Sequence, residues 1–105
     1  MWVGLFFSSS ATQAMVKNIP SRLIYAAQIR AARGLLNWSQ GALAERAGVS
    51  KQSVTRIENG TMDPRLSTMT ALNEAIRSAG VEMAEDVNGT VRLTVSRDKL
   101  LPPSD

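Results

Sequence analysis

The sequence predicts a mainly α-helical domain, in which four helices are followed by a C-terminal β-hairpin. Three observations support this fold class. Apolar residues recur at helical spacing between residues 21 and 79, serine precedes and glycine follows several of these segments, and the pattern changes to alternation after residue 80. The 105 residues fit one domain, and a hydrophobic share of 44% provides a small core.

The first helix is predicted to begin near Ser21, an N-cap candidate, and to run to Leu36. Asn37 then takes the left-handed capping position, which asparagine tolerates. Gly34 is an alternative end, but a helix that stopped there would leave the two leucines after it in a loop. Keeping Gly34 inside the helix costs about 1 kcal/mol relative to alanine.

Two short helices follow in close succession. The second is predicted over residues 40–47, after the N-cap Ser39, and it ends at Gly48. The third is predicted over residues 51–59, after the N-cap Ser50, and a glycine ends it as well. So little chain lies between the two helices that they must pack closely against each other.

The third helix has a polar outer face. Val54 and Ile57 are its only apolar residues, and they anchor it to the core. A helix fits the major groove of B-DNA, where glutamine can bind adenine and lysine or arginine can bind guanine. Lys51 and Gln52 stand at its start. Helix N-termini favour phosphate, which makes Gln40 and the start of the third helix candidates for contacts with the DNA backbone.

The fourth helix is predicted over residues 67–79, with an apolar stripe that includes Met69, Leu72 and Ile76. A β-hairpin is predicted over residues 81–97, where apolar and polar residues alternate around an Asn-Gly pair. The helical domain and the hairpin are therefore adjacent in the chain without a linker.

The register of the hairpin depends on the length of its loop. A two-residue Asn-Gly loop would divide the apolar residues between the two faces. A three-residue loop over residues 87–89 pairs Met83 with Leu93 and Val81 with Val95, so that the apolar residues share one face. Because a one-residue slip moves every side chain to the other face, we predict the three-residue loop, with its glycine left-handed.

The two ends of the chain are expected to lie outside the fold. Residues 1–20 are predicted to form a flexible extension and residues 98–105 a disordered tail. The apolar run WVGLFF near the N-terminus has no basic residue before it and is too short for a signal sequence or a membrane span. The alternatives for the first 14 residues are translation that starts at Met15 instead, and a peptide that docks on a partner.

Charge is unevenly distributed along the chain. The net charge of +3 divides into +5 over residues 17–65 and −2 over residues 66–105. Clustered positive charge is typical of a surface that binds a polyanion, although a solvated basic surface that binds nothing has the same charge.

The chain has no cysteine and no histidine. This composition excludes disulfides and thiolate metal sites, and it removes the commonest general base and metal ligand.

The segment SQGALAERAGVSKQSVTRIENG resembles the helix-turn-helix of the Xre family, the type found in phage repressors and Cro. The resemblance covers roughly residues 24–80 and implies a four-helix, lambda-repressor-like DNA-binding domain over residues 21–80. The positions that stand at the spacings expected of the family are Gln40, Ala44, Gly48, Val54 and Ile57.

The resemblance and the chemistry of the helices together suggest roles for individual residues. The residues expected to contact bases are Lys51, Gln52, Thr55 and Arg56. The alternative for Thr55 is that it is merely exposed to solvent. The alternative for Arg56 is a contact with a phosphate instead of a base. The residues expected to contact phosphates are Ser39, Gln40, Ser50, Ser53, Asn59 and Arg65.

Other matched positions belong to the scaffold. Arg33 and Glu58 match a pair that forms a buried ion pair between the first and third helices, and such a pair is costly to break from one side. Trp38 is expected to be a core or boundary aromatic residue. Ala42 stands where many members of the family have a carboxylate. The hairpin replaces the fifth helix of phage repressors, so the dimer geometry of those repressors is not carried over.

The hairpin suggests a dimer. A lone two-stranded hairpin is marginal in water, so its apolar face must be covered. We hypothesise a homodimer in which the hairpins build the interface, and a monomer with the hairpin packed on the fourth helix is the alternative. A dimer would present two third helices to half-sites about 10 bp apart or a multiple of that distance. The expected interface residues are Val81, Met83, Val91, Leu93 and Val95.

The sequence thus predicts a cytoplasmic, sequence-specific transcriptional regulator that binds an operator on double-stranded DNA. It predicts no cofactor, no metal and no membrane association. The alternative function is that of an antitoxin or antiactivator, which acts by binding a partner protein with or without DNA. No arrangement of residues indicates an enzyme.

Overall fold

The computed structural model describes residues 19–100, and residues 99 and 100 in their backbone only. Its elements are the helices α3 (Ser21–Leu36), α4 (Gln40–Ala47), α5 (Lys51–Glu58) and α6 (Leu66–Ser78), the antiparallel strands β1 (Val81–Glu85) and β2 (Val91–Val95), and the short helix α7 (Arg97–Leu100). The predicted fold class is therefore confirmed. Within the described residues, no helix is both long enough and apolar enough to span a membrane.

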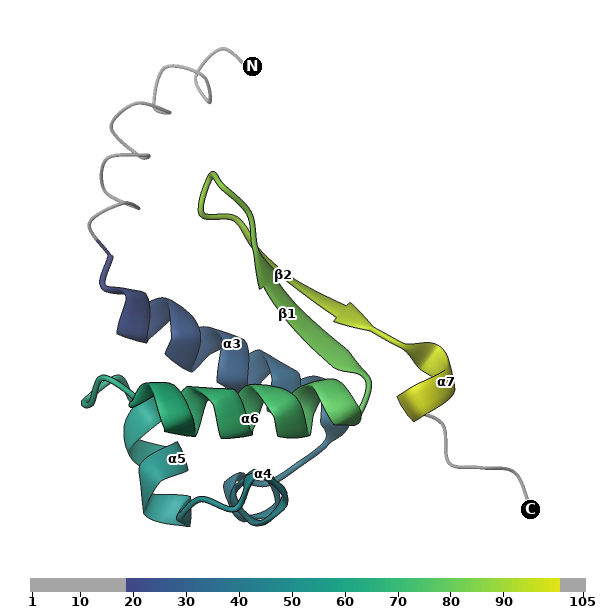
Figure 1. Ribbon diagram of the computed structural model, residues 1–105, viewed down its shortest axis with the longest axis horizontal. Coiled ribbons are helices and arrows are strands. Elements are labelled where there is room, and N and C mark those ends of the chain that lie inside the picture. Colours follow the sequence, from purple (N-terminus) through teal and green to yellow (C-terminus); the bar gives the residue numbers. More distant parts are fainter. Residues whose placement is uncertain (1–18, 101–105) are drawn as a thin grey trace.

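The hairpin packs across α3 and α6, on the side away from α4 and α5 (Figure 1). The core lies between these layers, and each of the four longer helices and β1 contributes to it. The largest fully buried side chains are Ile29, Leu43, Val54, Ile57, Leu72, Ile76 and Val81. Two of them, Val54 and Ile57, hold α5 to the core.

Most of the predicted helix ends are confirmed. Asn37 adopts a left-handed conformation with φ of 57°, and the hydroxyls of Ser39 and Ser50 accept backbone N–H groups at the starts of α4 and α5. Ser21 was wrong as an N-cap, because Pro20 occupies that position and Ser21 is the first helical residue. The fixed φ of proline suits the extended conformation that an N-cap requires.

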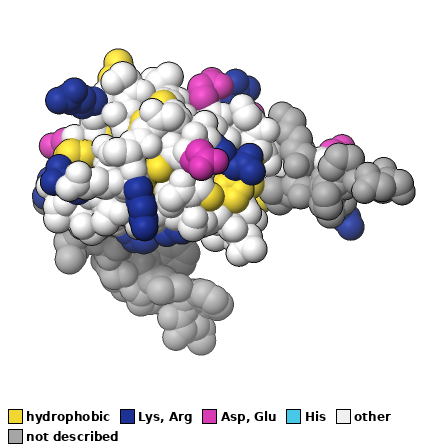
Figure 2. All heavy atoms as spheres, turned by 90° about the horizontal axis from the view of Figure 1, so that it is seen from below, with side chains coloured by type: hydrophobic (Ala, Val, Ile, Leu, Met, Phe, Trp, Pro, Cys, Tyr) yellow, Lys and Arg dark blue, Asp and Glu magenta, His cyan; other side chains and the backbone are white. Residues whose placement is uncertain are grey.

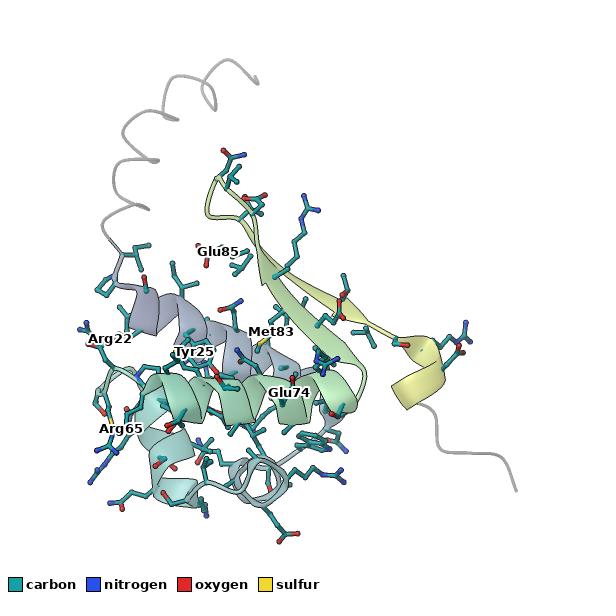
Figure 3. The ribbon with its side chains drawn as sticks, in the orientation of Figure 1. Arg22, Tyr25, Arg65, Glu74, Met83 and Glu85 are labelled. Carbon is teal, nitrogen blue, oxygen red and sulfur yellow. The ribbon has the colours of Figure 1, made fainter. Side chains whose placement is uncertain are left out.

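Helices α3 and α6 are joined by a hydrogen bond as well as by apolar packing. α6 begins at Leu66, one residue earlier than predicted. The Tyr25 hydroxyl on α3 donates to Asn73 Oδ1 on α6 at 2.8 Å, and Figure 3 shows the Tyr25 ring between the two helices. Burial raises the pKa of the Tyr25 phenol, so the hydroxyl keeps its proton as a donor throughout the neutral range.

The hairpin has the predicted register. Val81 pairs with Val95 and Met83 pairs with Leu93. Gly89 in the loop has φ of 83°, a left-handed conformation that favours glycine. The apolar residues of the two strands therefore share one face, as the three-residue loop requires.

That apolar face is used inside the chain. Val81 is fully buried, and Met83 and Leu93 pack against the core. Val91 is half-buried, and Val95 is 39% exposed. The assignment of Val81 to a dimer interface is therefore wrong, because a residue inside the core of its own chain cannot contact a second copy. The hairpin packs its apolar face against the helices of its own chain, which is the packing that the alternative to the dimer predicts.

The segment after the hairpin differs from the prediction. Residues 97–100 form α7, whereas residue 97 was assigned to the hairpin and residues from 98 onward to a disordered tail. Asp98 lies in the first turn of α7, where a negative charge interacts favourably with the helix dipole. The rest of the predicted tail and residues 1–18 of the predicted extension lie outside the described residues.

Gly34 lies inside α3, as predicted, but nothing in the described fold requires a glycine there. A Cβ atom at Gly34 would meet no heavy atom within 4 Å. Glycine in a helix interior costs about 1 kcal/mol relative to alanine. The internal packing of the described residues gives no compensation for that cost.

Candidate nucleic-acid interface

Helix α5 turns its polar side outward because two apolar side chains hold its other side. Val54 and Ile57 are 0% and 1% exposed. Since successive helical residues are about 100° apart, the opposite side of α5 and its C-cap carries Lys51, Gln52, Thr55, Arg56 and Asn59. Four of these residues are exposed and Thr55 is half-buried. The structure thus brings the four residues expected to contact bases onto one face.

The first turn of α5 is ordered by two serines. Ser50 Oγ accepts from the N–H of Ser53 at 3.0 Å and donates to Ser53 Oγ at 2.9 Å. The two hydroxyls expected to contact phosphates are therefore bound to each other in the free protein. Lys51 and Gln52 extend from this ordered turn and are exposed, so their backbone positions are defined before any ligand binds.

Gln40 and Thr55 join α4 to α5 in the free protein. Thr55 Oγ1 donates to Gln40 Oε1 at 2.8 Å, and Gln40 Nε2 donates to Glu58 Oε1 at 3.0 Å. Thr55 Oγ1 also lies 3.1 Å from the carbonyl oxygen of Lys51. The structure therefore gives both residues a role within the scaffold. Their contacts with DNA stay predictions, and Gln40 keeps one N–H for such a contact.

Arg33 and Glu58 form the ion pair that the resemblance implies. Arg33 Nε and Nη2 donate to the two carboxylate oxygens of Glu58 at 2.5 and 2.8 Å, and Arg33 Nη1 donates to the carbonyl oxygen of Trp38 at 2.8 Å. Glu58 is 4% exposed. Burial by itself raises the pKa of Glu58, but the hydrogen bonds from Arg33 and Gln40 outweigh burial, and the pKa lies below its ordinary value.

Two further arginines of α3, which were not identified from the sequence, bind the end of α5 and the loop that follows it. Arg30 Nη1 donates to the carbonyl oxygen of Glu58 at 2.6 Å, and Arg22 Nε donates to the carbonyl oxygen of Gly60 at 3.0 Å. Carbonyl groups at the end of a helix have no partner within the helix, and the positive charges suit the negative end of its dipole. Together with Arg33, these arginines fix the direction of α5.

A signal for this cluster was present in the sequence. Residues 22, 30 and 33 fall within about 80° of one another around a helix of 3.6 residues per turn. A basic row on that side of α3, next to the apolar core residues, indicates a contact with carbonyl groups or carboxylates. The resemblance singles out only Arg33 among these three arginines.

The loop after α5 is held against α3. Asn59 Oδ1 accepts from the N–H of Thr61 at 3.1 Å and from its hydroxyl at 2.7 Å. Gly60 has φ of 73°, and a Cβ atom there would lie 2.5 Å from Leu23 Cδ2. Figure 3 shows Arg22 and Arg65 at this end of the molecule, near the loop that joins α5 to α6. Asn59 and Arg65 are both exposed.

Gly60→Ala is expected to lower the free energy of unfolding by about 1–2 kcal/mol, because alanine is strained in the left-handed conformation. The new methyl group would also force Leu23 to move. Gly89→Ala is the matched control, since Gly89 has φ of 83° with open space around its Cβ position. Urea unfolding should show the larger loss for Gly60→Ala. Equal losses would contradict a tight contact between this loop and α3.

The start of α4 completes this surface. Ser39 Oγ accepts from the N–H of Ala42 at 3.0 Å, so its oxygen orders the cap. Trp38 is half-buried against the core, as expected, and the Arg46 guanidinium lies 4.5 Å from the centre of its ring. Figure 2 views the molecule from the α4 and α5 side, where basic side chains are spread over the surface with some acidic ones among them.

The arrangement of these elements agrees with a comparison against protein-family models. Residues 29–79 match the model described as Helix-turn-helix. The match includes the second half of α3 and all of α4, α5 and α6, and it leaves the hairpin outside. Comparison with curated proteins gives no match. Residues 29–79 are thus similar in sequence to the Helix-turn-helix family, and α4 and α5 lie wholly within the matched residues.

Proposed function

We propose that the protein is a sequence-specific DNA-binding transcriptional regulator that inserts α5 into the major groove of an operator. The observation that carries the proposal is the outward face of α5. Lys51, Gln52 and Arg56 are exposed there, on a helix whose direction three arginines of α3 define. Lysine and arginine suit guanine, and glutamine suits adenine. The proposed activity is binding, without chemistry and without a cofactor.

The contacts with phosphates are proposed to surround this face. Arg65 at the start of α6 supplies a free positive charge, and Asn59 offers its amide N–H groups. The first backbone N–H groups of α4 and α5 favour an anion, and the hydroxyls there order the caps. The proposed phosphate-contacting residues are Ser39, Gln40, Ser50, Ser53, Asn59 and Arg65.

The function is tested by selecting binders from a random pool of DNA duplexes. We expect one sequence to be enriched, and the affinity for that duplex to exceed the affinity for a scrambled one by roughly 10³-fold or more. Affinity for both duplexes should fall as salt rises, because phosphate contacts release counterions. Selection that enriches no sequence would contradict the proposal and leave only a basic surface.

A further inference from the structure

Helix α3 has a second apolar side, which faces away from the core. Its residues recur at four-residue intervals and are exposed, with exposed fractions of 43% and 45% at the two ends. An apolar side of a helix normally packs against another element. The outer side of α3 is therefore a surface to be covered, and its residues are Leu23, Ala27, Ala31 and Leu35.

This side of α3 and strand β2 form an apolar groove of about 390 Å³. Val91 and Leu93 line it from β2, and the only polar side chain in its lining is that of Gln28. No charged residue lines it. A nucleic acid or a charged peptide therefore does not match the groove, whereas an uncharged apolar surface does.

The outer side of α3 is complementary to itself. Its order of large, small, small and large side chains is the same in both directions along the helix. We infer that a second copy of this chain docks here, with the two α3 helices antiparallel around a two-fold axis. Leu23 then lies opposite Leu35 of the second copy, and Ala27 lies opposite Ala31. Such pairing of one patch with itself is the rule for two-fold dimers.

Gly34 provides an independent observation. It is exposed on the same side of α3, and no contact within the described residues requires a glycine there. Small side chains where two helices cross let their axes approach to about 8 Å. A second α3 packed on this side accounts for both the glycine and the two alanines.

The size of the surface sets the strength of the dimer. Eight residues line the groove, whereas a stable interface of standard size uses roughly 20–30 residues from each partner. We therefore expect a dimer with a dissociation constant in the micromolar range. This surface goes beyond the proposed function, and it joins the outer side of α3 to Val91 and Leu93 of the hairpin. The tests contain no DNA, so their outcome does not depend on whether the protein binds an operator.

Ala31→Glu tests the inference, because it adds a charge at the centre of the contact on an exposed helical position. In sedimentation equilibrium between about 1 μM and 1 mM, the wild-type protein should change from 11.4 kDa to twice that mass. The dissociation constant of Ala31→Glu should be at least about 30-fold higher. The matched control is Ala84→Glu, the same change at an exposed position on β1, which should dimerise like the wild type.

Cross-linking gives a second test, since the chain has no cysteine of its own. When the Ala27→Cys and Ala31→Cys variants are mixed and mildly oxidised, a disulfide should join the two different variants in preference to two identical ones. Thr70→Cys on α6, also exposed, should not cross-link. Any one of three results would overturn the inference. The wild-type protein could stay monomeric up to about 1 mM, both glutamate variants could dimerise equally well, or Thr70→Cys could cross-link.

Discussion

Arg33→Met is expected to lower the free energy of unfolding by about 3 kcal/mol at neutral pH, the lower end of the range for breaking a buried ion pair from one side. The substitution leaves the carboxylate of Glu58, which is 4% exposed, without its two strongest donors. It also removes the donor to the Trp38 carbonyl. Urea unfolding followed by circular dichroism at pH 7 measures the loss.

The effect should depend on pH with a definite sign. In the wild-type protein the pKa of Glu58 lies below its ordinary value. Its stabilising contribution is therefore fully present above the unfolded pKa of about 4.3 and is lost as pH falls through the folded pKa. Without Arg33, burial should raise the pKa of Glu58. The stability difference between wild type and Arg33→Met should then narrow as pH falls toward 4.

Arg77→Met is the matched control for this prediction. Arg77 and Glu74 form an ion pair on α6 in which both side chains are more than half exposed, and exposed pairs contribute little. We expect this variant to unfold like the wild type. A loss for Arg33→Met as small as that for Arg77→Met, or a difference that does not change with pH, would contradict the structural role of the buried pair.

The Lys51→Ala/Gln52→Ala double variant is expected to lose discrimination between the selected duplex and a scrambled one. Each base contact removed should cost about 1–3 kcal/mol, so the two together reduce the affinity for the selected duplex by roughly 30-fold or more. Both residues are exposed on the first turn of α5, so the fold should be unaffected. Fluorescence anisotropy titrations with both duplexes measure the loss.

Arg92→Ala is the control for charge. Like the double variant, it removes one positive charge, but Arg92 is exposed on β2, away from α5. We expect it to keep its preference for the selected duplex. An Arg65→Ala variant should instead weaken binding to both duplexes alike and reduce the dependence on salt, as the loss of a phosphate contact does. If the double variant behaved like Arg65→Ala, α5 would not read bases.

Local sequence signals predicted most of the helix ends and the hairpin register. Ser39 and Ser50 cap because a serine hydroxyl reaches a backbone N–H three residues on, and Asn37 ends α3 because asparagine tolerates a left-handed conformation. The alternation of valine, leucine and methionine favoured the register of the three-residue loop, since the register of the two-residue loop splits the apolar face. The N-cap at Pro20 was missed because a serine followed it.

The polar contacts of the candidate interface were harder to predict. Thr55 and Gln40 carry groups that suit DNA, yet in the free protein they bind each other. Arg22 and Arg30 look like surface charges in the sequence, yet they bind carbonyl groups more than 25 residues away in the chain. Such pairings depend on how α3 crosses α5, and residue spacing along one helix does not define that crossing.

The sequence by itself determined the order and type of the elements from α3 to β2, most of the helix caps and the polar face of α5, because these depend on residues close together in the chain. The tertiary structure alone decided where the hairpin lies. An apolar strand face must be covered, but burial is not directional, so the pattern could not distinguish a second copy from the chain's own helices. The fold resolved this by burying Val81 in the core, where β1 contacts α3 and α6, and it left the outer side of α3 exposed instead.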